Sequence, residues 1–276
     1  MSRDGVAIFF RRKSQPFEPC VHWVYAADGF RLLPFFIGLG GKTLSPNISP
    51  MLSSLLTAIV DDNRIAIEAL LRADASLATR AVGEPTLYEA GIFHWMYVGD
   101  TALHLAAAGY RVEVMQMLLA AGADANAYAN HRRSGPIHYA ADGYITGPAW
   151  NAEAQVRTLR CLLAAGAHIN TQDMNGASPL HRAVRTRCVA AVNFLLSAGA
   201  NVLARNNAGS TPFHLAVQNT GRGGSGEAAA QHAQQQIIET FLSAGMDINC
   251  KDGKGKSVLT CANSSWVRSM LTGSAA

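Results

Sequence analysis

The sequence lacks several features that would assign it to a specialised class of protein. No apolar run approaches the roughly 18 to 20 residues of a membrane-spanning helix, and the longest, residues 32–39, is interrupted by Pro34 and Gly38. Charged residues make up only 15% of the chain and the formal net charge is +4, so the composition does not indicate nucleic-acid binding. We expect a soluble, cytoplasmic protein that does not enter membranes.

Cysteine is scarce and irregularly spaced. No two cysteines are separated by two residues, the spacing that zinc sites and redox motifs require, and their number is odd: Cys20, Cys161, Cys188, Cys250 and Cys261. We therefore expect free thiols in a reducing compartment rather than a disulfide framework, and no bound metal.

Sequence signatures of catalysis are also missing. GLGGKT at 38–43 resembles a phosphate-binding loop, but the spacing GxxxxGK[ST] requires glycine where Phe36 stands. Gly255-Lys256-Ser257 fails in the same way, because residue 250 is Cys250. No GxSxG nucleophile motif is present. We expect neither enzymatic activity nor a cofactor.

A pattern of two short helices is present at residues 99–128. The first helix is expected to start at Thr101, whose hydroxyl can cap it, and the second to end before Gly122, which can adopt the left-handed conformation. The apolar residues recur at helical spacing in both: Leu103, Ala106 and Ala107, then Val114, Met117 and Leu118. Two such helices cannot bury both faces alone, so the unit needs neighbours of its own kind.

Similar units follow at 136–170, 177–202 and 210–249, with shorter versions from residue 50 and at the end of the chain. The histidines at 104, 138, 181 and 214 mark the period, since they are separated by 34, 43 and 33 residues. A period near 33 indicates a repeat array.

The repeated residues resemble the ankyrin repeat. The motif Thr-Pro-Leu-His appears as Thr101-Ala102-Leu103-His104, Ser178-Pro179-Leu180-His181 and Thr211-Pro212-Phe213-His214, and Gly-Ala-Asp-x-Asn appears at 122–126. The resemblance implies an all-α solenoid of stacked helix pairs with β-hairpin loops. It would span residues 48–276, with four central repeats and atypical terminal repeats.

The resemblance also implies a structural role for the four repeat histidines, His104, His138, His181 and His214. Each is expected to tie adjacent hairpins together by hydrogen bonds. Neighbouring repeats are about 10 Å apart, whereas metal ligands lie about 2 Å from their ion, so these histidines are not expected to share a metal.

Residues 1–47 and three inserts do not follow the repeat. Residues 1–47 have no steady helical or strand period, and we expect a poorly ordered arm. Inserts occur near 84–98, 143–152 and 220–233; the last begins glycine-rich and then becomes rich in alanine and glutamine. That composition predicts a linker followed by a helix from about Glu227. The first insert is expected to be a loop whose aromatic residues, Phe93, Trp95 and Tyr97 among them, either cover the core or bind a partner.

Basic residues from separate repeats are expected to lie on one side of the solenoid. The register places them at hairpin tips and on one inner helix: Arg132, Arg133, Arg182, Arg185, Arg205, Lys251 and Lys254. They either form a binding surface or are ordinary solvated charges.

We predict a non-catalytic, monomeric protein-interaction module or scaffold that binds a protein partner of acidic or aromatic-seeking character through its concave face and hairpin tips. The alternatives are a secreted bacterial effector or a regulatory subunit that uses the same face. An enzyme would need residues 1–47 and the aromatic loop to build a pocket, and a nucleic-acid-binding protein, which is not expected, would show a steep salt dependence.

Overall fold

A computed structural model describes residues 49–88, 91–92, 94–143, 150–218 and 228–273, together with the backbone of 25–26 and 29–30. The chain divides into two compact units, Met1–Ser45 and Pro46–Ala276. In the first unit, strand β1 (Tyr25–Ala26) pairs antiparallel with β2 (Gly29–Phe30). The expected disorder of residues 1–47 otherwise concerns positions outside the described residues, as does Phe93.

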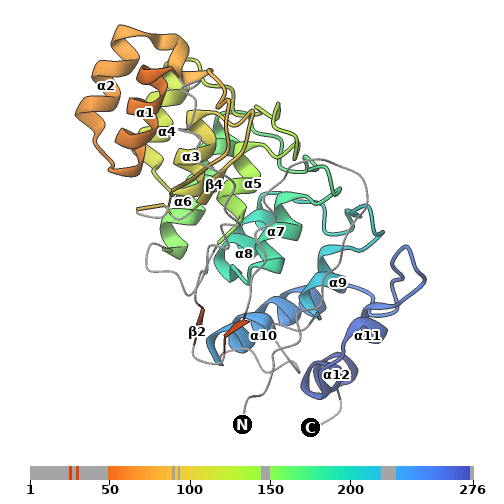
Figure 1. Cartoon of the computed structure of the whole chain (residues 1–276). Helices are drawn as coiled ribbons and strands as arrows, with labels where there is room; N and C mark the ends of the chain where they lie inside the picture. Colours follow the sequence, from red (N-terminus) through yellow and green to blue (C-terminus); the bar gives the residue numbers. More distant parts are fainter. Residues whose placement is uncertain are drawn as a thin grey trace, which may run out of the picture. The chain divides into compact units, whose positions relative to one another are not determined.

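The second unit is a series of helix pairs that follow one another along the chain (Figure 1). The first helices of the pairs are α1 (Pro50–Val60), α3 (Ala102–Ala108), α5 (Pro136–Ala141), α7 (Pro179–Arg185), α9 (Pro212–Ala216) and α11 (Val258–Cys261). The second helices are α2 (Arg64–Ala73), α4 (Val112–Ala120), α6 (Ala152–Ala164), α8 (Val189–Ser197), α10 (Ala228–Ser243) and α12 (Ser265–Thr272). A short 3-10 helix, Ala75–Ala78, follows α2.

First helices pack on first helices and second on second, so the two rows enclose one continuous core. Every residue of α3 and α5 is buried, and the small side chains of α3, such as Ala106 and Ala107, allow its neighbours to approach closely. In α4 the buried residues are Val114, Met115 and Leu118, whereas Met117 is only half-buried. Met117 packs against the core from the edge of the predicted apolar stripe, and Met115 adds a fully buried residue to it.

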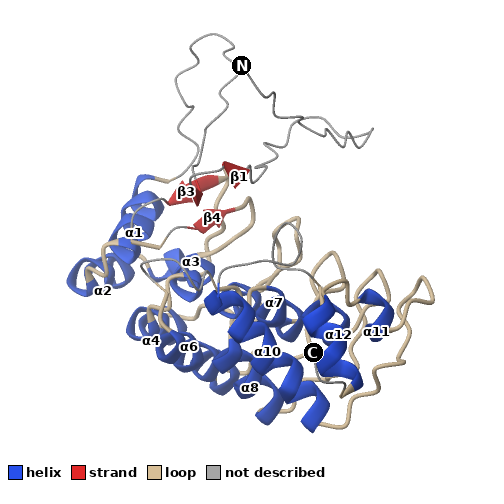
Figure 2. Ribbon diagram, turned by 90° about the horizontal axis from the view of Figure 1, so that it is seen from below, coloured by secondary structure: helices blue, strands red, loops and turns tan. Residues whose placement is uncertain are grey.

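The fold is the predicted all-α solenoid. The insert near 84–98, however, is not an irregular loop. It contains a β-hairpin in which β3 (Thr86–Tyr88) pairs with β4 (His94–Met96), and β4 packs against α3 (Figure 2). Thr86, Tyr88 and Trp95 in these strands favour β structure, and Gly91 between the strands has a φ of +76°.

The other two inserts are described in part. The long helix α10 begins at Ala228, one residue after the predicted start, which confirms that prediction. Residues 144–149 of the second insert lie outside the described residues; at its end, Trp150 Nε1 donates to Gln155 Oε1 over 3.1 Å and the Asn151 side chain caps α6. Four cysteines in the described part of the chain, Cys161, Cys188, Cys250 and Cys261, are free thiols.

Candidate protein-binding surface

Tight turns before the first helices form the hairpin tips, defined as residues 95–100, 129–134, 172–177, 205–210 and 251–256. At the fifth position of every tip the backbone has a positive φ: Gly99 (+92°), Arg133 (+49°), Gly176 (+71°), Gly209 (+70°) and Gly255 (+76°). Glycine adopts this conformation without steric cost. The tips therefore share one turn geometry, but Arg133 places a side chain where the other four tips have glycine.

In three of the tips, a side-chain carboxylate or amide at the start of the turn fixes its shape by hydrogen bonds. Asp173 Oδ1 accepts hydrogen bonds from the N–H groups of Asn175 and Ala177. Asn206 and Asp252 do the same in their own turns. Such local bonds satisfy backbone donors that have no helical partner.

Adjacent tips are also bonded to each other. The Met174 N–H donates to Arg132 O over 2.8 Å, and the Asn207 N–H donates to Asn175 O over 2.9 Å. The Gly253 N–H donates to Ala208 O over 3.0 Å and so continues the row. The last four tips therefore form a connected row of backbone, which is more rigid than independent loops.

The four repeat histidines lie beneath this row and join it to the first helices. In His104, Nδ1 accepts the Thr101 N–H over 3.0 Å and Nε2 bonds Ser134 O over 3.0 Å. The same two bonds recur, to Gly135 N–H and Ala177 O at His138, to Ser178 N–H and Ser210 O at His181, and to Thr211 N–H and Lys256 O at His214. Both ring nitrogens are thus occupied within the protein, and neither is available to a ligand.

Two departures from the repeat pattern have local consequences. Gly135 has no hydroxyl, so Nδ1 of His138 accepts only the Gly135 N–H, over 3.1 Å. In the other three units a Thr or Ser hydroxyl also bonds Nδ1. Thr260 occupies the histidine position of the last unit and bonds the Ser257 hydroxyl over 2.8 Å.

A buried polar cluster lies between the first two tips. Asp100, fully buried, accepts from the Tyr139 hydroxyl over 2.6 Å and from the Asn130 amide over 2.7 Å. It also accepts the Tyr97 N–H over 2.7 Å, and the His94 ring lies 4.9 Å from that of Tyr139. Burial raises the pKa of the Tyr139 hydroxyl and lowers that of the His94 imidazole. Asp100 and Tyr139 thus satisfy each other in the interior, whereas the partly buried His94 bonds Trp95 O over 2.8 Å.

Arg182 is not part of the surface, contrary to the prediction. Its side chain is 3% exposed and donates to Asp142 over 2.8 Å and to Asp173 over 2.7 Å. It also donates to the Ser134 hydroxyl over 2.6 Å. The prediction failed because the partners of Arg182 come from other parts of the chain. Asp142 lies at the end of α5, and Asp173 lies in the hairpin that precedes α7. Arg182 therefore links repeats in the interior.

Arg185, one turn further along α7, is exposed as predicted: its side chain is 59% accessible and approaches Asp142 at 3.4 Å. Arg132 is half-buried, with its guanidinium 4.7 Å above the Tyr97 ring. Arg205 is exposed, but its guanidinium donates to Gly209 O over 2.6 Å and to Lys251 O over 2.7 Å. It thus clamps two tips while keeping its charge at the surface.

Arg133, Lys251 and Lys254 are exposed, and no ion pair engages them within the described residues. Lys256, which the sequence analysis did not single out as a binding residue, is exposed beside them. Its position in the last tip, two residues after Lys254, was the signal that could have found it.

The aromatic insert contributes to the core. Met96 is fully buried, and Tyr88 and Tyr97 pack against the core residues. Trp95 is half-buried and pairs with Leu87 across the hairpin. The alternation of the strand places Trp95 on the face opposite His94 and Met96. Part of the insert therefore covers the core, and Trp95 lies on its other face.

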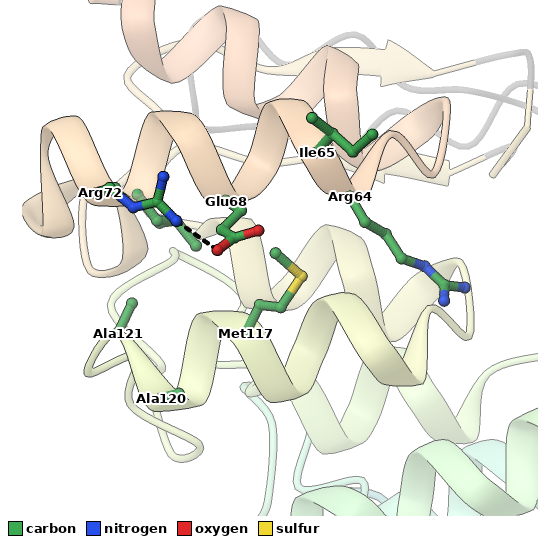
Figure 3. A pocket seen from close by; sticks show the side chains of 8 residues that line it. Arg64, Ile65, Glu68, Arg72, Met117, Ala120 and Ala121 are labelled. Atoms are coloured by element: carbon green, nitrogen blue, oxygen red, sulfur yellow. Dashed lines mark hydrogen bonds and ion pairs between the residues drawn. The ribbon is translucent and has the colours of Figure 1, made fainter.

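A shallow groove of about 550 Å³ lies between α2 and α4, on the row of second helices (Figure 3). Its apolar lining includes Leu71 and Met117. Charged side chains at its edge are paired, Arg72 with Glu68 over 2.6 Å and Arg64 with Glu113 over 3.4 Å. The groove brings together no nucleophile and base.

Helices in the described part of the chain are all too short or too polar to cross a bilayer. The His, Cys, Asp and Glu side chains of the same residues form no group of three or more that could hold a metal ion.

The stacked helix pairs and the connected tips define a helical repeat protein. Family comparison gives the kind of repeat: the ankyrin repeat matches residues 98–130, and a description of ankyrin repeats in three copies matches residues 149–225. The chain is an ankyrin-repeat protein. Ankyrin repeats are in general protein–protein interaction modules. A comparison with curated proteins finds no match.

Proposed function

We propose that this chain binds another protein through its hairpin tips and does not catalyse a reaction. The observation that carries the proposal is the contrast between the tip backbone and the tip side chains. The backbone is fixed by turn bonds and by bonds from tip to tip, whereas Arg133, Lys251 and Lys254 extend to solvent without an ion pair among the described residues. A surface ordered before binding loses little entropy when a partner docks.

The charge balance of the tips favours an acidic partner segment. Asp173 and Asp252 each accept two backbone N–H groups within their own turns, and Asp100 is buried. The basic side chains, by contrast, remain exposed. This leaves a positive surface, which would attract carboxylates and orient an approaching partner. The free thiols support a reducing compartment such as the cytoplasm.

An enzymatic function has less support. The Asp100, Tyr139 and His104 side chains resemble an acid–base group in composition, but all three are at most 2% exposed and are bonded to one another or to backbone. A catalytic base must reach a substrate proton. The same tip surface would serve a regulatory subunit or a secreted effector equally well.

Charge reversal at the last tip tests the proposal. Random dodecapeptides displayed on phage are selected on the intact protein and then measured by fluorescence anisotropy. The double variant Lys251→Glu and Lys254→Glu is expected to bind them about tenfold more weakly at low salt, because two attractive contacts become repulsive. The difference should shrink as salt is raised.

The matched control is Arg72→Glu with Arg157→Glu, which makes the same change in net charge on the second helices, where both arginines are exposed. This control should bind as the wild type does. Equal losses in the two double variants would mean that net charge, and not the tips, governs binding. Unchanged binding in the tip variant would contradict the proposal.

A further inference from the structure

Arg133 occupies a backbone position that the other four tips fill with glycine. Its φ is +49°, in the left-handed region that is unfavourable for residues with a Cβ. Its N–H donates to Asn130 O over 2.9 Å, so the turn needs the backbone of this residue. The fold does not need its side chain, because glycine makes the same turn at Gly99, Gly176, Gly209 and Gly255.

The other non-glycine residues with positive φ differ from Arg133 in one respect. Among the described residues these are Asp62, Tyr110 and Arg187. Asp62 pairs with Arg64, the Tyr110 hydroxyl donates to Asp142 O, and Arg187 donates to Val184 O and Gln218 O. Each of these side chains thus compensates for its backbone with a contact inside the protein.

The Arg133 side chain, by contrast, is exposed and has no hydrogen bond or ion pair within the described residues. Because no side-chain contact inside the fold compensates for this unfavourable backbone conformation, the conformation points to a role in function.

The tips on either side of Arg133 present apolar side chains. Val98 in the preceding tip and Met174 in the following one are each 48% exposed. Met174 is held next to Arg132 by the bond from its N–H to Arg132 O, and the Arg132 guanidinium covers the Tyr97 ring. Arginine, methionine and aromatic side chains are enriched in protein interfaces, and all three kinds occur on these three neighbouring tips.

The carboxylates of this region are already used within the protein. Asp100 is bonded to Tyr139 and Asn130, while Asp142 and Asp173 are paired with Arg182. The fork of a guanidinium matches a carboxylate, which can accept two parallel hydrogen bonds. The ligand must therefore bring its own carboxylate.

We infer that Arg133 binds the carboxylate of an Asp or Glu side chain in an extended segment of a protein partner, with a neighbouring apolar side chain of that segment resting on Met174 or Val98. This inference rests on the proposed function and assigns its central contact. A protein is favoured over a nucleic acid because the tips on both sides of Arg133 present exposed apolar side chains, Val98 and Met174.

The test uses Arg133→Gly in the full chain. This variant should be at least as stable as the wild type, with a melting temperature up to about 3 °C higher, because glycine removes the strain. It should nevertheless bind the selected dodecapeptides at least about tenfold more weakly. A side chain that merely supported the fold would lower stability and binding together. Arg133→Lys keeps the charge but loses the forked guanidinium, so its affinity for the peptides should lie between those of the wild type and Arg133→Gly.

Peptides selected on the wild type should be enriched in Asp or Glu next to an apolar residue, and this enrichment should disappear in selection on Arg133→Gly. Equal affinity for both proteins, or no acidic enrichment, would overturn the inference. If Lys251→Glu with Lys254→Glu abolished binding while Arg133→Gly did not, the proposed function would stand and this inference would fail.

A selection that returned no peptide on either protein would count against both proposals. A labelled 20-nucleotide single-stranded DNA serves as the second probe. Its tight binding to the wild type and release from Arg133→Gly would overturn the inference by assigning the site to phosphate.

Discussion

Replacing Arg182 with alanine is expected to lower the free energy of unfolding by about 3–5 kcal/mol, because the buried Asp173 would lose its cation and Asp142 would keep only the 3.4 Å approach of Arg185. The Arg182 guanidinium donates to Asp142, Asp173 and the Ser134 hydroxyl. It thereby connects α7 to the end of α5 and to two hairpins.

Protonation equilibria support the same conclusion. Burial alone would lower the pKa of Arg182, but Asp142 and Asp173 outweigh it and raise that pKa above its ordinary value. Burial likewise would raise the pKa of Asp142 and Asp173, yet Arg182 keeps both below the usual range. All three groups are therefore charged near neutral pH. Removing one of them leaves a buried charge without its partner, which costs more free energy of unfolding than replacing all three with apolar residues.

The matched control is Arg185→Ala, one turn away on α7. Arg185 is 59% exposed and makes a single 3.4 Å approach to Asp142, so its loss should cost less than about 1 kcal/mol. Urea unfolding followed by circular dichroism measures both. The free energy that Arg182→Ala is expected to lose is a large part of the total stability of a typical domain. Arg182→Lys, which keeps the positive charge, is therefore measured as a milder variant. Equal midpoints for the alanine variants would show that the buried pairs are not stabilising.

The sequence predicted the repeat well because each unit contains its own start and stop signals. Thr101 stands at the start of α3 and Gly122 follows the end of α4 with a positive φ, as predicted. The Thr101 hydroxyl, however, bonds His104 Nδ1 and makes no cap bond to the helix backbone. The histidine period gives the stacking order. These are local features, and they recur, so one unit can be compared with the next.

Contacts between repeats were not predictable in this way. Arg182 and Asp142 are 40 positions apart, and nothing in the spacing of the helix distinguishes Arg182 from the exposed Arg185. The β-hairpin at 86–96 could have been predicted, since β-favouring residues flank Gly91. The strain at Arg133 depends on its φ angle, which the sequence does not contain: only the three-dimensional alignment of the tips places this arginine where the others have glycine.

Acidification from pH 7 toward pH 4 is expected to destabilise the protein through its buried histidines. In each repeat histidine Nδ1 accepts a backbone N–H, which places the proton on Nε2 and keeps the ring neutral. A second proton would have to go to Nδ1 and would break the bond that holds the first turn of the helix. Burial accordingly lowers the pKa of His104, His181 and His214, and lowers that of His138 to about 4.

The sign of the effect follows from these pKa values. Below the ordinary pKa of about 6.5, the unfolded chain takes up protons that the folded protein does not, so the free energy of unfolding falls with pH. At about 1.4 kcal/mol per pKa unit, His138 alone would contribute a loss on the order of 3 kcal/mol by pH 4. The other three repeat histidines also lower the free energy of unfolding as the pH falls, and their effect begins in the same pH range.

Urea midpoints at pH 7.5, 6.0 and 5.0 measure the slope. His138→Gln should have a shallower dependence on pH than the wild type, whatever its stability at neutral pH, because one proton fewer distinguishes the two states. His232→Gln, which removes an exposed histidine from α10, should leave the slope unchanged. If His138→Gln kept the full wild-type slope, the bond from the Gly135 N–H to the ring would not be what excludes the proton.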